Sequence, residues 1–167
     1  IAPGTHVQGS ASTAAGYNGT GVCDQFRPSG QTSLAASSGT SHSTPAVAGA
    51  ASLLYRWLQT EYGLADPSPA LVKSYFMTHP TYLTGFGAND TLPSNTQGFG
   101  MPNLASAFDD ATARLITDQT VVLGVTGQTH QVLGAVSDPS RATRIALSWT
   151  DAPGAASSAT PQVNNLD

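Results

Sequence analysis

The sequence predicts a chain in two parts, with helices in residues 1–112 and strands in residues 113–167. Three observations lead to this division. Apolar side chains recur at helical spacing over residues 41–61, a helix start signal stands at residues 68–69, and apolar and polar residues alternate after about residue 113. The chain has 167 residues, which is enough for about one domain.

The first part is expected to begin with a short extended piece over residues 1–10. Residues 16–33 hold several glycines, prolines and serines, so they predict an irregular loop. This loop holds Cys23, the only cysteine, so no disulfide can form within the chain. We interpret Cys23 as a small loop residue, and a bond to a cysteine outside the chain is left open.

Three helices are expected next. The first covers residues 41–61, and Gly63 is expected to end it. The second begins at Ser68, where a serine cap precedes a proline, and runs to about Thr78. A short third helix is expected over about residues 102–109.

Strands are expected in the second part. Alternation of apolar and polar side chains predicts strands over 120–125, 129–136 and 144–150. Proline-containing turns begin at Asp138 and Asp151 and would separate or end these strands.

Residues 38–49 form a turn of small residues that leads directly into the first helix. Gly39 permits a tight backbone, and Pro45 suits the first helical turn, where its missing N–H costs nothing. Ser41 would then stand above the positive end of the helix dipole, beside free backbone N–H groups. This geometry suits the binding of an oxyanion.

The string Gly39-Thr40-Ser41-His42-Ser43-Thr44-Pro45, followed by Val47-Ala48-Gly49, resembles the nucleophile segment of the subtilisin-like serine proteases. Three other pieces resemble this family in the same order along the chain. They are Ile1-Ala2-Pro3-Gly4-Thr5 before the nucleophile, Ser68-Pro69-Ala70-Leu71-Val72-Lys73-Ser74 after it, and the segment from Gln97 to Ala107. Residues 145–151 and 163–167 resemble part of the β-sandwich domain that follows the catalytic domain in some bacterial members.

The resemblance implies a fold class and two domains. Residues 1–112 would be the C-terminal part of an α/β catalytic domain with a mainly parallel sheet. Residues 113–167 would be the start of an incomplete antiparallel β-sandwich of the jelly-roll type. The family's catalytic Asp and His and its oxyanion-hole Asn precede the segment that opens this chain. We therefore expect the chain to be the C-terminal portion of a longer protein and to be inactive alone.

The resemblance assigns the site residues. Ser41 falls on the catalytic nucleophile of a serine endopeptidase, which hydrolyses peptide bonds through an acyl-enzyme. Gly39 and Thr40 line the nucleophile turn and are expected to contact substrate. His42 is expected to shape the leaving-group side rather than to act as the base, because neighbouring residues at a helix start point in different directions. Ser43 and Thr44 are expected to cap the helix.

The composition limits the classes of partner that we expect for the chain. Only 10% of residues are charged and the net charge is −4, so no basic cluster indicates nucleic acid. No apolar run approaches the roughly 20 residues that span a bilayer. The expected partners are polypeptide substrates and the N-terminal part of the same protein, in a secreted enzyme. No cofactor or metal site is expected, although Asn164, Asn165 and Asp167 leave calcium open.

Two other functions are weighed. An inactive pseudoprotease or protein-binding module would keep the turn and lose the triad. An esterase-type hydrolase is disfavoured, because the Gly-x-Ser-x-Gly elbow that it needs is absent around Ser41. His6, His79 and His130 are interpreted as surface or turn residues, and Asp109 and Asp110 as solvated carboxylates that end a helix.

Overall fold

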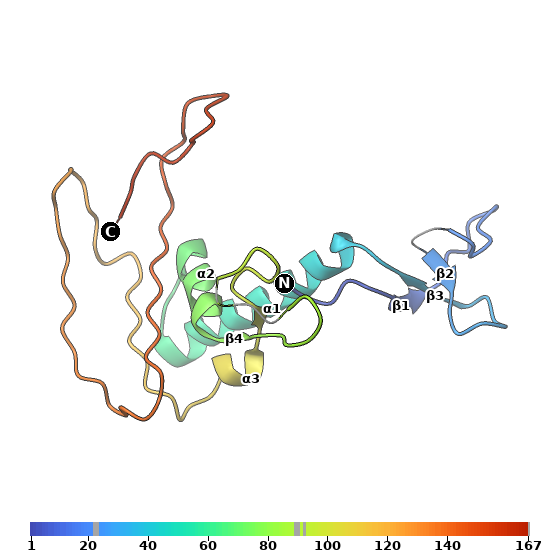
Figure 1. Ribbon diagram of the computed structural model, residues 1–167, viewed down its shortest axis with the longest axis horizontal. Coiled ribbons are helices and arrows are strands. Elements are labelled where there is room, and N and C mark those ends of the chain that lie inside the picture. Colours follow the sequence, from blue (N-terminus) through green and yellow to red (C-terminus); the bar gives the residue numbers. More distant parts are fainter. Residues whose placement is uncertain (22–23, 89–90, 92, 167) are drawn as a thin grey trace.

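The computed structural model describes residues 1–21, 24–88, 91 and 93–166. It is elongated, with a small sheet at one end, a helical cluster in the middle and extended chain at the other end (Figure 1). The expectation for Cys23 lies outside the described residues.

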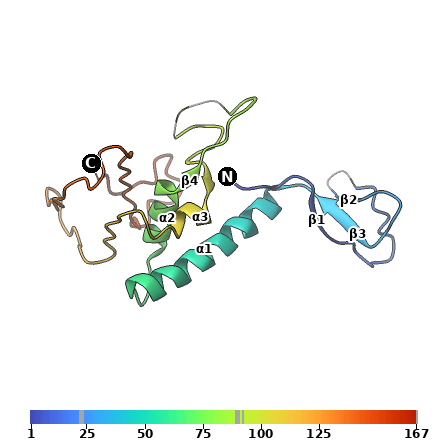
Figure 2. The same ribbon diagram turned by 90° about the horizontal axis from the view of Figure 1, so that it is seen from below.

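The helical cluster holds the core. Helix α1 (Thr40–Tyr62) is 23 residues long, and α2 (Pro69–Thr78) and α3 (Leu104–Ala107) pack on its second half (Figure 2). Leu54 and Leu58 of α1 are fully buried. Three more buried residues from α2 and α3 complete this core: Leu71, Tyr75 and Ala107.

The predicted helix boundaries are confirmed for α1 and α2. Gly63 ends α1 in the left-handed conformation, with φ 65°, a region that favours glycine. The Ser68 hydroxyl accepts a hydrogen bond from Leu71 N at 3.0 Å and so caps α2. Asp118 holds that serine in turn, accepting from Ser68 N at 2.8 Å and from its hydroxyl at 2.6 Å. The third helix is shorter than predicted, at four residues.

Two small sheets are present. The first pairs β1 (Val7–Ser10), β3 (Leu34–Ser37) and β2 (Asp24–Phe26) in the order β1–β3–β2. The second pairs β4 (Pro80–Thr81) with β5 (Met101–Pro102). Every pair is antiparallel.

The prediction of an α/β fold with a mainly parallel sheet is therefore wrong. No parallel pair occurs among the described residues. Parallel strands need a crossover of a dozen or more residues, usually a helix, whereas antiparallel strands need only a short connection. The residues described between β1 and β3 contain no helix that could serve as a crossover. In the sheet, β3 lies between β1 and β2 and pairs antiparallel with both.

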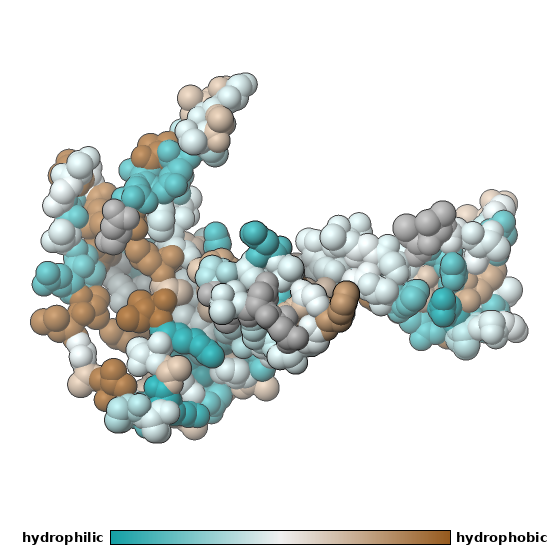
Figure 3. Space-filling model, in the orientation of Figure 1, coloured by the Kyte–Doolittle hydropathy of each residue, from teal (hydrophilic) through white to brown (hydrophobic). Residues whose placement is uncertain are grey.

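The predicted β-sandwich is also absent. Within the described residues 113–166 no strand is formed, and this chain folds back and forth in extended conformation (Figure 1). Its apolar side chains stay exposed, for example Leu133 at 91% and Ile145 at 92% (Figure 3). A strand becomes stable on a pleated surface packed against other residues, and these side chains meet no second layer.

Candidate functional site

Two segments far apart in sequence form the turn before α1. Residues 1–6 lead outward to β1, and residues 38–39 return from β3 to the helix. Gly39 N donates to Gly4 O at 2.7 Å, and His6 N donates to the Ser38 hydroxyl at 2.9 Å. Two of the four pieces that carry the family resemblance therefore lie side by side.

The glycine that the packing requires is Gly4, which the sequence did not single out. A Cβ atom on Gly4 would overlap Ser43 Oγ and lie 2.8 Å from Gly39 O. Gly39 itself has φ 160° and ψ 162°, an extended backbone that any residue adopts. A Cβ there would meet only Ser41 N, at an ordinary 3.8 Å. The interpretation that Gly39 permits a tight backbone is therefore wrong.

Ser41 lies in the first turn of α1 and is exposed. Gly39 occupies the cap position and offers no side chain, so no side chain caps the helix. The first turn also contains no acidic residue. His42 N donates to Gly39 O at 3.1 Å. The amides of Thr40 and Ser41 make no hydrogen bond within the described part of the chain and stand at the positive end of the helix dipole.

The expectation that Ser43 and Thr44 cap α1 is wrong. The Thr44 hydroxyl donates to Thr40 O at 2.9 Å, a carbonyl one turn back. No side chain accepts from the first amides of the helix. Those amides therefore stay available to an oxygen of a bound molecule.

Two open hollows flank the turn. The first, of about 420 Å³, is lined by Gly39, Thr40 and Ser43 together with Ala2, Gly4, Thr5 and Ser38. The second, of about 540 Å³, extends along α1 and is mostly apolar. Its lining comprises Ile1, Ala2, Thr40, Ser43, Thr44, Val47, Ala48 and Ala51. Gly39 and Thr40 thus line the first hollow, whereas exposed Ser41 and half-buried His42 line neither hollow.

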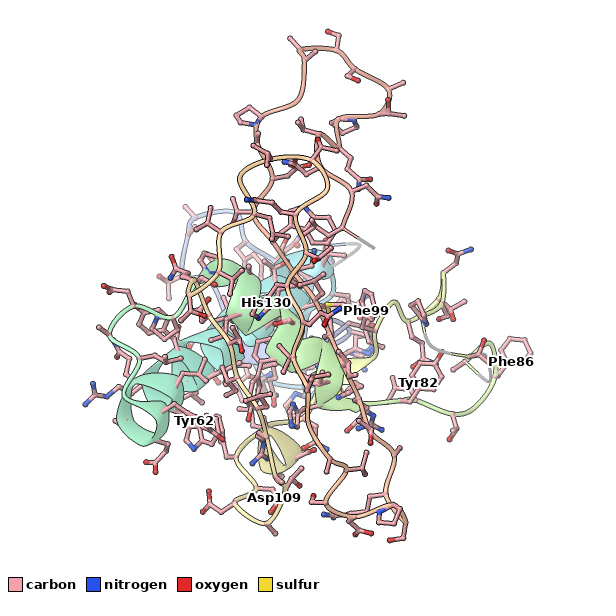
Figure 4. All side chains as sticks on the ribbon, turned by 90° about the vertical axis from the view of Figure 1, so that its left-hand side faces the viewer. Tyr62, Tyr82, Phe86, Phe99, Asp109 and His130 are labelled. Carbon is pink, nitrogen blue, oxygen red and sulfur yellow. The ribbon has the colours of Figure 1, made fainter. Side chains whose placement is uncertain are left out.

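No general base stands beside Ser41 in the described part of the chain. Its hydroxyl makes no hydrogen bond there to a histidine or a carboxylate. His6 is exposed on the approach to β1, and His130 lies in the extended chain (Figure 4). The described residues contain no group of three or more His, Cys, Asp or Glu that could hold a metal ion.

The two carboxylate regions serve local structure. Asp109 accepts from Ala111 N at 2.8 Å and from the Thr112 hydroxyl at 2.7 Å, and these bonds, with that from Thr112 the larger cause, lower its pKa. Asp151 accepts from Val163 N at 2.7 Å and so closes the 151–163 loop. Asp167, one of the oxygen donors considered for calcium, lies outside the described residues.

His79 lies at a bend directly after α2, which agrees with the turn position that the sequence predicted for it. Its ring is half-buried rather than fully exposed. The ring stacks on Tyr75, with centroids 4.5 Å apart. Its only sequence signal was its position directly before Pro80, which also ended the predicted helix.

Comparison of the chain with protein-family models, with curated proteins and with solved structures gave no match. None of the described helices is long and apolar enough to cross a membrane. The subtilisin-like resemblance rests on the sequence motifs, and its functional meaning is taken up next as a proposal.

Proposed function

We propose that the chain carries the nucleophile of a subtilisin-like serine endopeptidase, and that Ser41 is that nucleophile. One observation supports this most. Ser41 is exposed in the uncapped first turn of α1, with the Thr40 and Ser41 amides beside it. An ordinary capping serine would precede the helix and accept from such an amide, and Ser41 does neither.

The chemistry is acyl transfer to serine. Ser41 Oγ attacks the carbonyl carbon of a peptide bond, and a base takes the hydroxyl proton. The proton then passes to the leaving amine, and water releases the acyl group from Ser41 by the same steps. The Ser41 N–H donates to the oxygen that becomes negative, and one donor of this kind is worth roughly 2.7–4 kcal/mol.

A base must come from elsewhere. A serine hydroxyl is a poor nucleophile near neutral pH without an adjacent base, and the described residues bring none to Ser41. In our proposal a histidine and a carboxylate outside these 167 residues complete the site, together with a second oxyanion donor. The 167-residue chain alone should then be inactive.

The hollows at the turn before α1 suit a polypeptide substrate. Gly39 and Thr40 line the first hollow, and the second offers a mostly apolar wall for side chains. We propose that Gly39 and Thr40 contact the substrate and that His42 lies on the leaving-group side. The proposed enzyme needs no cofactor and acts as a secreted protein.

A second function is a pseudoprotease that binds polypeptide without cleaving it. The observation that favours it is the hydroxyl of Ser41, which has no base beside it in the described residues. The hollows at the turn would still receive a peptide. This alternative predicts binding that survives Ser41→Ala unchanged.

The test is labelling with a fluorophosphonate probe, which reacts only with an activated serine. The probe is applied to the 167-residue chain and to a longer form of the protein that contains it. Ser41→Ala is the test variant, and Ser52→Ala, an exposed serine further along α1 that lines neither hollow, is the matched control. We expect labelling of the longer form and its Ser52→Ala variant, and none of Ser41→Ala or the short chain.

Absence of labelling in the longer form would favour the binding protein. A folded longer form that takes no label, and that binds fluorescein-labelled casein with the same affinity before and after Ser41→Ala, would exclude the peptidase and support the binding protein.

A further inference from the structure

A cluster of side chains around His79 lies outside the proposed peptidase site. His79 Nδ1 lies 3.0 Å from Tyr75 O and 2.9 Å from the Thr78 hydroxyl. On the other side of the ring, Arg114 Nε donates to His79 Nε2 at 3.3 Å. His79 therefore joins the end of α2 to the chain that follows α3.

The partners fix the protonation state of the ring. An arginine side chain has donors and no acceptor, so His79 Nε2 must accept and carry no proton. The proton then sits on Nδ1, which donates to Tyr75 O. The observed contacts require the neutral imidazole, because a protonated ring has a donor at both nitrogens.

Arg114 ties several segments together from this position. Its guanidinium donates to Thr112 O at 3.1 Å, to Ser106 O at 3.0 Å, and to Asp109 O. It also stands over the Trp57 ring of α1, 5.8 Å from the centroid. Arg114 thus holds the start of the extended chain against the helical cluster.

The extended chain returns to the same place further on. Arg144 donates to Thr78 O at 3.2 Å, beside His79. Ser148 Oγ lies 4.0 Å from Met77 Sδ, also on α2. The first residues of this chain have separate anchors, because Asp118 accepts from Ser68 N and from its hydroxyl, and Gln119 Nε2 donates to Asp66 O at 3.2 Å. The C-terminal end of α2 is therefore where residues 144–148 are fastened.

We propose that His79 is an acid-sensitive latch, which holds residues 144–148 on α2 while its ring is neutral and releases them when the ring is protonated. Protonation removes the acceptor for Arg114 Nε and places two cations in contact. Arg144, which donates to the neighbouring Thr78 O, faces the same positive charge on the His79 ring.

The surroundings of the His79 ring, taken together, oppose its protonation. Arg114 and Arg144 face it from the extended chain, Asp109 from the turn after α3, and Tyr75 from α2, while α1 presents the uncharged Trp57. Burial is the main cause that lowers the pKa of His79, and both arginines add to it. The bond to Tyr75 O and the charge of Asp109 act in the opposite direction.

The pH range follows from this direction. In the released state the ring has its ordinary pKa of about 6.5, so that state binds the proton at higher pH than the latched state. The latch is intact above about pH 6.5 and weakens as the pH falls below it. One proton shifts the ratio of released to latched chain by up to tenfold per pH unit.

Two measurements test the latch on the 167-residue chain. The first is an NMR titration of the His79 ring, which we expect to give a pKa below 6.5. The second is a distance distribution between spin labels at Lys73→Cys on α2 and Ile145→Cys on the extended chain, in a Cys23→Ser background. Both label positions are exposed.

We expect one narrow distance at pH 7.5 and a broad, longer distribution at pH 5. His79→Gln keeps an acceptor oxygen and cannot titrate, so its distribution should be the same at both pH values. His130→Gln, an exposed histidine in the extended chain, is the matched control and should keep the wild-type response. A His79 pKa at or above 6.5, or a wild-type distribution that does not change with pH, would overturn the proposal. So would a His79→Gln variant that folds and still responds.

Discussion

Replacing Leu54 with alanine should destabilise the protein far more than replacing its neighbour Leu53. Both leucines lie in α1, so the change in helix propensity is the same. Leu54 is fully buried, whereas Leu53 is 57% exposed. The two variants differ only in what surrounds the side chain, and each is the control for the other.

The expected loss in the free energy of unfolding follows from the full burial of Leu54. Leu→Ala removes three carbons, and each buried CH₂ is worth about 0.8 kcal/mol, which gives about 2.4 kcal/mol. A cavity that does not collapse adds up to about 2 kcal/mol more. Leu54→Ala should therefore lower the free energy of unfolding by about 2–5 kcal/mol, whereas Leu53→Ala should change it by less than about 1 kcal/mol.

Urea unfolding followed by circular dichroism at 222 nm measures both values. Helix content reports α1 and α2, which hold the core. A core of so few buried residues leaves little reserve, so the Leu54→Ala transition should begin at very low urea concentration. Equal midpoints for the two variants would refute the packing of α1 against α2 and α3 described above.

Two further predictions concern Tyr75 and the turn before α1. Burial raises the pKa of Tyr75 to about 12. The contribution of Tyr75 to the free energy of unfolding is therefore fully present below about pH 10, the ordinary tyrosine pKa, and is lost as the pH rises towards 12. Tyr75→Phe should remove this alkaline dependence, and at neutral pH it should cost about 1 kcal/mol, because the 2.7 Å bond to Ala107 O is lost. Thermal unfolding at several pH values checks both effects. Gly4→Ala should lower the melting temperature and reduce fluorophosphonate labelling of the longer protein, since the new methyl group overlaps Ser43 Oγ. Gly9→Ala, where a Cβ meets nothing within 4 Å, should do neither, and equal effects of the two glycine changes would contradict the close approach at Gly4.

Local signals in the sequence predicted α1 and α2 almost to the residue. A cap such as Ser68, a helix-ending glycine such as Gly63 and an apolar face around Leu54 act within a few residues of each other. Their energetics depend little on the rest of the chain. The exposed position of Ser41 at the start of α1 follows from the same local rules, because it depends on where the helix begins.

Sheet pairing could not be predicted in this way. Alternation over residues 129–136 and 144–150 favours strands, but a strand forms only when a partner edge and a packed face are present. No strand forms among the described residues after 113. The resemblance implied parallel pairing, but every described pair is antiparallel, including β1 with β3 and β4 with β5, which lie well apart along the chain.

The sequence by itself determined the helices and the place of Ser41, the proposed nucleophile, at the start of α1, because both depend on neighbours along the chain. The tertiary structure decided which glycine the turn needs and how far the His79 ring is buried. Gly4 matters because a segment about 40 residues away packs on it, and His79 becomes half-buried because Arg114 reaches it from 35 residues further on. Contacts over such distances depend on how the whole chain packs, which periodicity and capping signals do not encode.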